Sequence, residues 1–190
     1  MKLFNTIAAA ALVVSFPAFA ANYTLDASHT NARFTIDHFG TSSNVGAFYN
    51  LEGSVKYDAK AKTGFVDVTL PLKNLDTGRS AFTEHLRGDG FFKAAKYPNI
   101  RFVSEVWNFD ASGKVTSVDG KLTMVGKTYP VTLKATKFGC YDSAMLKKQV
   151  CGGDFEATID RTQWGIDQYV QYMPASRYVK LNIQIEAAKQ

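Results

Sequence analysis

Apolar and polar residues alternate in several short segments of this chain, and this alternation limits the fold more than any other feature. In residues 32–38, alanine, phenylalanine, isoleucine and histidine alternate with arginine, threonine and aspartate. Successive side chains of a β-strand point to opposite faces, so this segment predicts a strand with one apolar and one polar face. The same period recurs at 51–57, 66–72 and 100–106, and in the last segment one face carries Ile100, Phe102, Ser104 and Val106. The pattern predicts an all-β protein.

Further strands are predicted towards the C-terminus, separated by turns at 110–113 and 125–127. The total of about eight strands is the number that closes a small antiparallel β-barrel. Gly53 and Gly120 lie inside strand patterns and suit the sharp bends that closure needs. A two-layer sandwich is the alternative that the pattern alone leaves open. The additional strands are expected at 114–124, 128–139, 153–160 and 177–187.

One stretch, Arg79–Arg87, has apolar residues at helical rather than alternating spacing. It is followed by the glycine-rich sequence 88–90 and by a pair of phenylalanines, which favours a short helix that ends there. A helix between two barrel strands would cover one mouth or wall of the barrel. It would present apolar side chains to the interior, namely Phe82, Leu86, Phe91 and Phe92.

The first twenty residues are typical of a secretory signal peptide. Met1 and Lys2 precede an apolar run at 3–16, and the sequence Ala18-Phe19-Ala20 forms a small-x-small cleavage site. Because the apolar run is short for a membrane span, we predict cleavage after Ala20. The mature domain is then 21–190, in the periplasm. An uncleaved membrane anchor is the competing interpretation.

The sequence of the mature region disfavours both a membrane-spanning segment and a nucleic-acid partner. No apolar run there reaches the length of a transmembrane helix, so we predict no integral membrane segment. The formal net charge of the whole chain is +5, which becomes +4 without Lys2, and the basic residues are scattered along the chain, as on a solvated surface. Scattered charge and export together predict no nucleic-acid partner.

Cys140 and Cys151 are the two cysteines of the chain. An oxidising compartment should pair them as a disulfide across the base of a hairpin or its loop. Closing so short a loop would stabilise the fold by about 3 kcal/mol. A redox role is the alternative, which the absence of a Cys-x-x-Cys motif disfavours.

The sequence carries no recognisable catalytic motif. It contains no Gly-x-Ser-x-Gly elbow, His-Glu-x-x-His, phosphate-binding glycine loop or dinucleotide fingerprint. The three histidines, His29, His38 and His85, fall in different elements without the spacing of metal ligands. We therefore predict a protein that is not an enzyme, has no metal site and requires no cofactor.

Aromatic and aliphatic side chains are abundant on the predicted inward faces. The interior of an eight-stranded barrel either fills with such side chains or holds one elongated apolar ligand. Composition does not choose between a packed core and a ligand cavity. If there is a cavity, its predicted lining is Phe34, Ile36, Phe48, Phe82, Leu86, Phe91, Phe92, Phe102, Leu122, Met124, Leu133, Phe155 and Trp164.

Several motifs resemble those of one family, the YceI-like polyisoprenoid-binding proteins, and the match covers almost the whole mature chain. The opening pattern is Asp26-Ala27-Ser28-His29-Thr30, with Thr30 where the family often has serine, followed by 32–40 and 45–48. The middle pattern, the most specific, combines 85–87, 91–92 and 96–102. The last patterns are 120–126 and 159–161 with Trp164-Gly165-Ile166. The cysteine pair departs from the general family pattern.

This resemblance implies a lipocalin-like antiparallel barrel that holds a long prenyl chain, such as that of a respiratory quinone or a polyprenyl phosphate. It also implies a homodimer. Each buried CH₂ contributes about 0.8 kcal/mol, so such a chain binds without any polar motif. The polar residues expected near its head group are His38, His85, Arg87 and Arg161. A turn or an internal ion pair is the competing role for Arg161.

Two other functions remain open at this point. One is an enzyme that acts on a bound isoprenoid, because polar groups lie among the predicted wall residues. The other is a surface or interaction protein without a ligand, in which the apolar interior is only a core.

Overall fold

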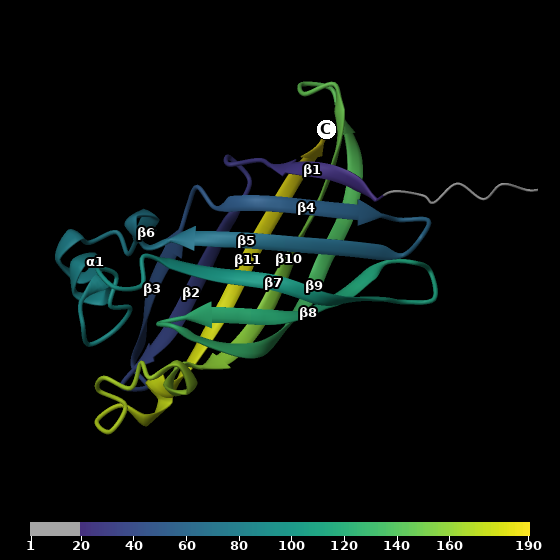
Figure 1. The fold of residues 1–190 in the computed structure, drawn as a ribbon. Coiled ribbons are helices and arrows are strands. Elements are labelled where there is room, and N and C mark those ends of the chain that lie inside the picture. Colours follow the sequence, from purple (N-terminus) through teal and green to yellow (C-terminus); the bar gives the residue numbers. More distant parts are fainter. Residues whose placement is uncertain (1–19) are drawn as a thin grey trace, which may run out of the picture.

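The computed structural model describes residues 20–190 and forms a closed antiparallel β-barrel (Figure 1). The predicted signal peptide falls almost entirely on residues 1–19, outside the described residues. Within 20–190, eight strands pair in a ring, and the pairing of the last strand with the first closes it. In ring order these strands are β1 (Ala21–Leu25), β4 (Glu52–Asp58), β5 (Thr63–Pro71), β7 (Asn99–Phe109), β8 (Val115–Met124), β9 (Lys127–Ser143), β10 (Lys148–Asp160) and β11 (Tyr178–Lys189).

Three further strands, β2 (Asn31–His38), β3 (Ser42–Phe48) and β6 (Leu75–Asp76), extend the sheet beyond the ring. The long strand β11 pairs with β2 along Val179–Gln184 and with β1 along Ala187–Lys189. The predicted barrel of about eight strands is therefore confirmed, and the sandwich alternative is excluded. The set of strands in the ring differs from the predicted set. The strand β2 lies outside the ring, and the ring is completed by the short strand β1, which the alternation did not reveal.

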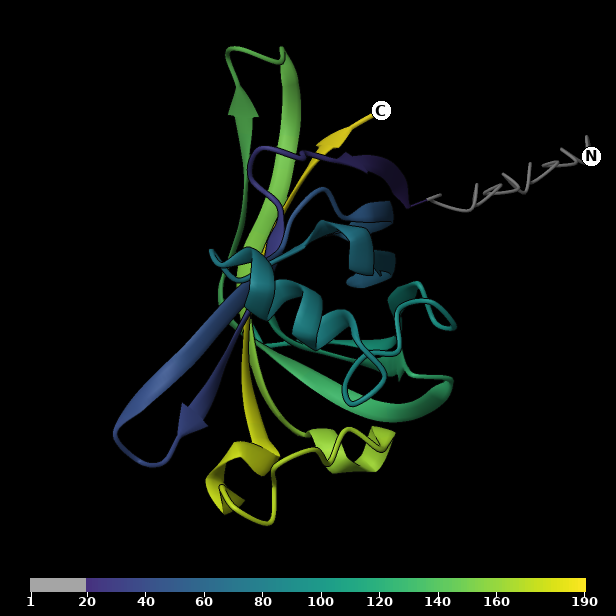
Figure 2. The same cartoon turned by 90° about the vertical axis from the view of Figure 1, so that its left-hand side faces the viewer.

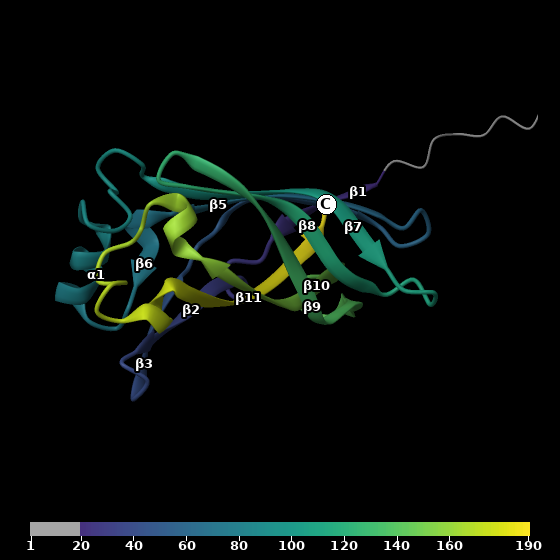
Figure 3. The same cartoon turned by 90° about the horizontal axis from the view of Figure 1, so that it is seen from below.

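The predicted helix is present as α1 (Ser80–Arg87), and it lies across one end of the barrel, in front of the strands in Figure 2. Three short 3₁₀ helices accompany it: η1 (Leu72–Asn74), η2 (Arg161–Trp164) and η3 (Pro174–Arg177). The segment that carries η2 and η3 lies at the same end of the barrel as α1 (Figures 1 and 3). In residues 20–190, no helix has both the length and the apolar character needed to cross a membrane.

The two glycines predicted at sharp bends, Gly53 and Gly120, lie where neighbouring strands approach closely. A Cβ at Gly53, whose φ is +146°, would lie 2.1 Å from the carbonyl oxygen of Asp67. A Cβ at Gly120 would lie 2.5 Å from the ring of Phe102 and from the carbonyl oxygen of Val103. Neither position accommodates a side chain without moving the neighbouring strand.

A β-bulge changes the predicted alternation in β7. The pairing of β7 with β8 shifts register between Ser104 and Val106. Because an extra residue turns the following side chains to the opposite faces, Val106 is 51% exposed, and Trp107 points into the barrel instead. The predicted inward position of Val106 is therefore wrong.

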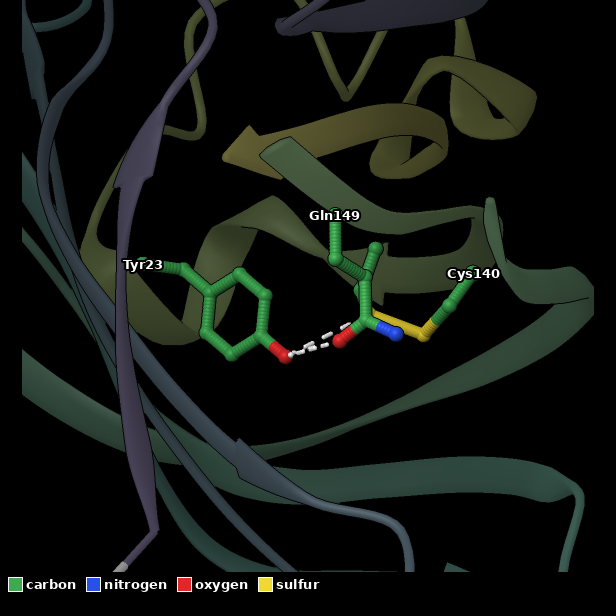
Figure 4. The surroundings of a disulfide bond; sticks show 4 residues. Tyr23, Cys140 and Gln149 are labelled. Atoms are coloured by element: carbon green, nitrogen blue, oxygen red, sulfur yellow. Dashed lines mark hydrogen bonds between the residues drawn. A yellow bond between two sulfur atoms is a disulfide. The ribbon is translucent and has the colours of Figure 1, made fainter. Parts of the chain in front are cut away.

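The predicted disulfide joins Cys140 to Cys151, and this pairing is confirmed. The two residues lie directly opposite each other in the β9–β10 hairpin. Close to the bridge, the hydroxyl of Tyr23 donates a hydrogen bond of 3.0 Å to the side-chain oxygen of Gln149 (Figure 4). The bridge joins the two strands of the hairpin, and the hydrogen bond of Tyr23 connects the hairpin to β1.

Candidate functional site

The barrel encloses a cavity of about 340 Å³ lined almost wholly by apolar side chains. Inward-facing residues of β10 contribute to its wall from Cys151 to Ile159, and Arg161 follows them. At about 3.3 Å per residue, this stretch of strand covers roughly 26 Å. The cavity is therefore long as well as apolar, and its volume lies within the range of ligand pockets in proteins.

Aromatic rings gather at the end of the cavity near the disulfide, which we call the disulfide end. The ring centroids of Tyr57 lie 5.8 Å from Trp107 and 5.2 Å from Phe138, and those of Trp107 and Phe138 lie 6.1 Å apart. Burial raises the pKa of the Tyr23 and Tyr57 phenols above the ordinary value, so both stay neutral at pH 7. This end therefore presents uncharged, mostly apolar surface.

The opposite end, which we call the helix end, is formed by α1, the phenylalanines that follow it and the segment between β10 and β11. His85 lies among aromatic rings there, with centroid distances of 5.0 Å to Phe91, 6.2 Å to Tyr169 and 6.5 Å to Phe82. These contacts join α1 to the segment that carries η2 and η3. They place a polar ring in the cavity wall among apolar neighbours.

Arg161 is the most buried charged residue at the helix end, with 5% of its surface exposed. Its Nε donates to the carbonyl oxygen of Ser176 at 2.7 Å, and Nη2 donates to the Ser176 hydroxyl at 3.0 Å and to the Gln168 carbonyl at 2.9 Å. Its guanidinium carbon lies 5.9 Å from the centre of the Phe91 ring. Burial lowers the pKa of this arginine, while Asp167 and Asp160 act in the opposite direction.

The structure places nearly all of the predicted lining residues in the cavity wall; their contact with a ligand stays a prediction. Trp164 is the exception, since it is buried but does not line the cavity. Its indole nitrogen donates to the carbonyl of Leu122 at 3.1 Å, and its ring packs 5.2 Å from Tyr129. The residue belongs to η2, and strand alternation does not predict where a 3₁₀ side chain points. The wall residues predicted and found are Phe34, Ile36, Phe48, Phe82, Leu86, Phe91, Phe92, Phe102, Leu122, Met124, Leu133 and Phe155.

Three of the predicted head-group residues, His38, His85 and Arg161, also line the cavity. Arg87 does not. Its guanidinium donates to the carbonyl oxygens of Leu72 at 2.9 Å, Lys73 at 2.7 Å and Leu75 at 3.0 Å. Arg87 therefore holds the end of α1 against η1 and β6, which is a structural role rather than a role at the cavity.

The sequence did not single out the aromatic residues of the disulfide end. Tyr57 belonged to an alternating segment and could have been placed inward. Trp107 could not, because the bulge before it reverses the alternation. Tyr23 lies on β1, which is too short to show a period, and Phe138 lies near the end of a predicted strand.

Outside the cavity, one group of potential metal ligands occurs among residues 20–190, formed by Asp26, His29 and Glu186. The Nδ1 atom of His29 lies 2.9 Å from a carboxylate oxygen of Asp26, and Glu186 accepts a bond from the hydroxyl of Tyr141 at 3.1 Å. The bond to Asp26 raises the pKa of His29 and lowers that of the aspartate. Each of the three side chains therefore already has a hydrogen-bond partner within the protein.

Comparison with known proteins identifies the family of this barrel. Residues 23–187 match the family described as YceI-like domain. The chain belongs to the YceI-like family. The protein YceI of Salmonella arizonae is 31% identical over 185 residues, which are 96% of this chain and 94% of that protein.

Two solved structures share the fold of this chain. A Campylobacter jejuni YceI protein superposes with a TM-score of 0.71 at 24% identity, covering 82% of this chain and 90% of that one. A polyisoprenoid-binding domain from Saccharophagus degradans superposes with a TM-score of 0.61 at 12% identity, covering 90% and 99% of the two chains. At these identities the likeness establishes the YceI-like barrel.

Proposed function

We propose that the protein binds one long-chain isoprenoid lipid, a prenyl quinone or a polyprenyl phosphate, inside the barrel. The observation that carries this proposal is the long apolar cavity between the disulfide end and the helix end. Each CH₂ moved from water into such a cavity contributes about 0.8 kcal/mol. A chain that occupies its length gains enough to exceed the about 4–15 kcal/mol lost on association.

The shape of the cavity favours a chain over a compact ligand. Its wall follows β10 for most of that strand's length, and the polar side chains of the wall are concentrated towards the helix end. An isoprenoid has a long hydrocarbon tail and a single polar head, which matches this distribution. The polyisoprenoid-binding domain from Saccharophagus degradans, which has the same fold, supports the same class of ligand.

We further propose that the protein works in the periplasm as a carrier or store, without catalysis. The predicted signal peptide supports export, and the Cys140–Cys151 bridge fits an oxidising compartment. His85 contacts aromatic rings, and no hydrogen bond joins it to a nucleophile among the described residues. A homodimer is part of the proposal from the family resemblance, and light scattering of the purified protein tests it.

Filling the cavity tests the binding function. Ile183 lines the cavity from β11, so Ile183→Trp should occupy space that the tail requires. We expect the wild-type melting temperature to rise with added prenyl quinone or polyprenyl phosphate, and the rise to be lost in Ile183→Trp. Val45→Trp is the matched control, because Val45 is 57% exposed on β3. A wild-type protein that gains no stability from either lipid would refute the proposal.

A further inference from the structure

Arg161 is a buried cation that contacts no anion within residues 20–190. Each of its three donated hydrogen bonds ends on a neutral oxygen of Ser176 or Gln168. Its remaining terminal nitrogen, Nη1, is buried and has no acceptor among the described residues. Buried charges in proteins are normally paired, because an uncompensated charge away from water is costly. The guanidinium therefore lacks one partner.

The neighbouring acids do not supply that partner. Asp160 accepts hydrogen bonds from Arg177 and from the hydroxyl and backbone nitrogen of Thr162. Asp167 influences Arg161 only through its charge, without an ion pair between the two side chains. The missing partner must come from outside this set of residues.

Arg161 lines the cavity at the helix end, together with Gln168 and Ser176, which fix its orientation. The guanidinium lies over the ring of Phe91. We propose that Arg161 binds an anionic oxygen of the lipid head group, so that the cargo is an isoprenoid phosphate rather than a neutral quinone or alcohol. This inference rests on the proposed binding of an isoprenoid in the barrel.

The two ends of the cavity then take the two parts of the ligand. The phosphate lies at the helix end beside Arg161 and His85, and the hydrocarbon tail extends along β10 towards Trp107 and Phe138. A guanidinium suits this task because its planar donors match the oxygens of a phosphate. The disulfide end has only neutral, mostly aromatic side chains, which suit the tail.

The test compares two ligands that share one hydrocarbon tail and differ only in the phosphate group. Delipidated mature protein is titrated with a polyprenyl monophosphate and with the polyprenol of the same chain length, and binding is followed by tryptophan fluorescence. Hydrogen bonds to charged groups contribute enough for the wild type to bind the phosphate about tenfold or more tightly than the alcohol. In Arg161→Gln the affinity for the phosphate should fall to that for the alcohol, while the affinity for the alcohol stays unchanged.

Arg101→Gln is the matched control, because Arg101 pairs with Asp67 on the exposed face of β7. It should keep the preference for the phosphate. Equal affinities of the wild type for phosphate and alcohol would overturn the head-group assignment and leave the binding function intact. A preference that persists in Arg161→Gln would overturn the role of this arginine. Binding of neither ligand would refute the proposed function itself. If Arg161→Gln does not fold, the wild-type comparison still decides whether the site selects an anion.

Discussion

Leu25 of β1 pairs with Ala187 of β11, and this contact between the two ends of the described chain closes the barrel. The same short strand pairs on its other side with β4. Tyr23 and Thr24 therefore have register partners in both β4 and β11, and this double pairing makes the wall of the cavity continuous.

Removing a backbone donor from β1 should open this closure. Thr24 has a register partner on each side, Ser54 in β4 and Ala188 in β11. Thr24→Pro cannot donate a ladder hydrogen bond, so we expect it to lower the free energy of unfolding by about 1–3 kcal/mol. Thr24→Ala keeps the donor and should stay close to the wild type. Urea denaturation measures both, and equal losses in the two variants would show that the closing bonds are not the cause.

The disulfide should make stability sensitive to reductant. Reducing the bridge, or replacing both cysteines by serine, frees the β9–β10 loop and should cost about 3 kcal/mol. Urea melts of the wild type with and without dithiothreitol give this difference. The double variant is the control, since reductant should not alter its midpoint. A wild type that melts identically in both conditions would mean that the bridge contributes no stability.

Arg87 should matter for stability and not for ligand choice. Its guanidinium donates to three carbonyl oxygens of the η1–β6 segment, so Arg87→Gln should lower the free energy of unfolding by about 1.5–3 kcal/mol. Arg79→Gln, at the other end of α1, serves as the control. The preference of Arg87→Gln for a charged over a neutral lipid should equal that of the wild type. Loss of that preference would place Arg87 at the head group after all.

The ion pair of Asp160 and Arg177 should produce an acid-dependent loss of stability. The bond from Arg177 lowers the pKa of Asp160 from 3.8 to about 2. A carboxyl with a depressed pKa stabilises the fold above its unfolded pKa, and this contribution disappears as the pH falls from about 4 to about 2. Asp160→Asn lacks the titrating group, so its stability should fall less steeply over that window. Parallel pH profiles of the two proteins would exclude this contribution.

The sequence predicted the elements better than their partners. Alternation located most strands and helical spacing located α1, because burial of one face leaves a period in the residues. It did not reveal which strands close the ring: β1 is too short to show a period, and β2 has the same pattern whether it lies inside or outside the barrel. The reversal at Trp107 follows from a bulge that only the pairing of β7 with β8 defines.

The candidate site shows the same limit. Inward-facing apolar residues were predictable from alternation, whereas Trp164 and Arg87 belong to helical segments whose side chains pack against backbone carbonyls. No pattern in the sequence distinguishes Arg87 from Arg161, although one stabilises a helix and the other lines the cavity. Their difference depends on tertiary contacts alone.

The most direct test of the lipid-binding account is mass spectrometry of an organic extract from the mature protein purified from its native periplasm. An unrelated exported protein and the Ile183→Trp variant are processed in parallel. The account predicts a prenyl lipid in stoichiometric amount with the wild type, and little with either control. A folded wild-type protein whose extract contains no prenyl lipid would contradict it and favour a barrel without a ligand.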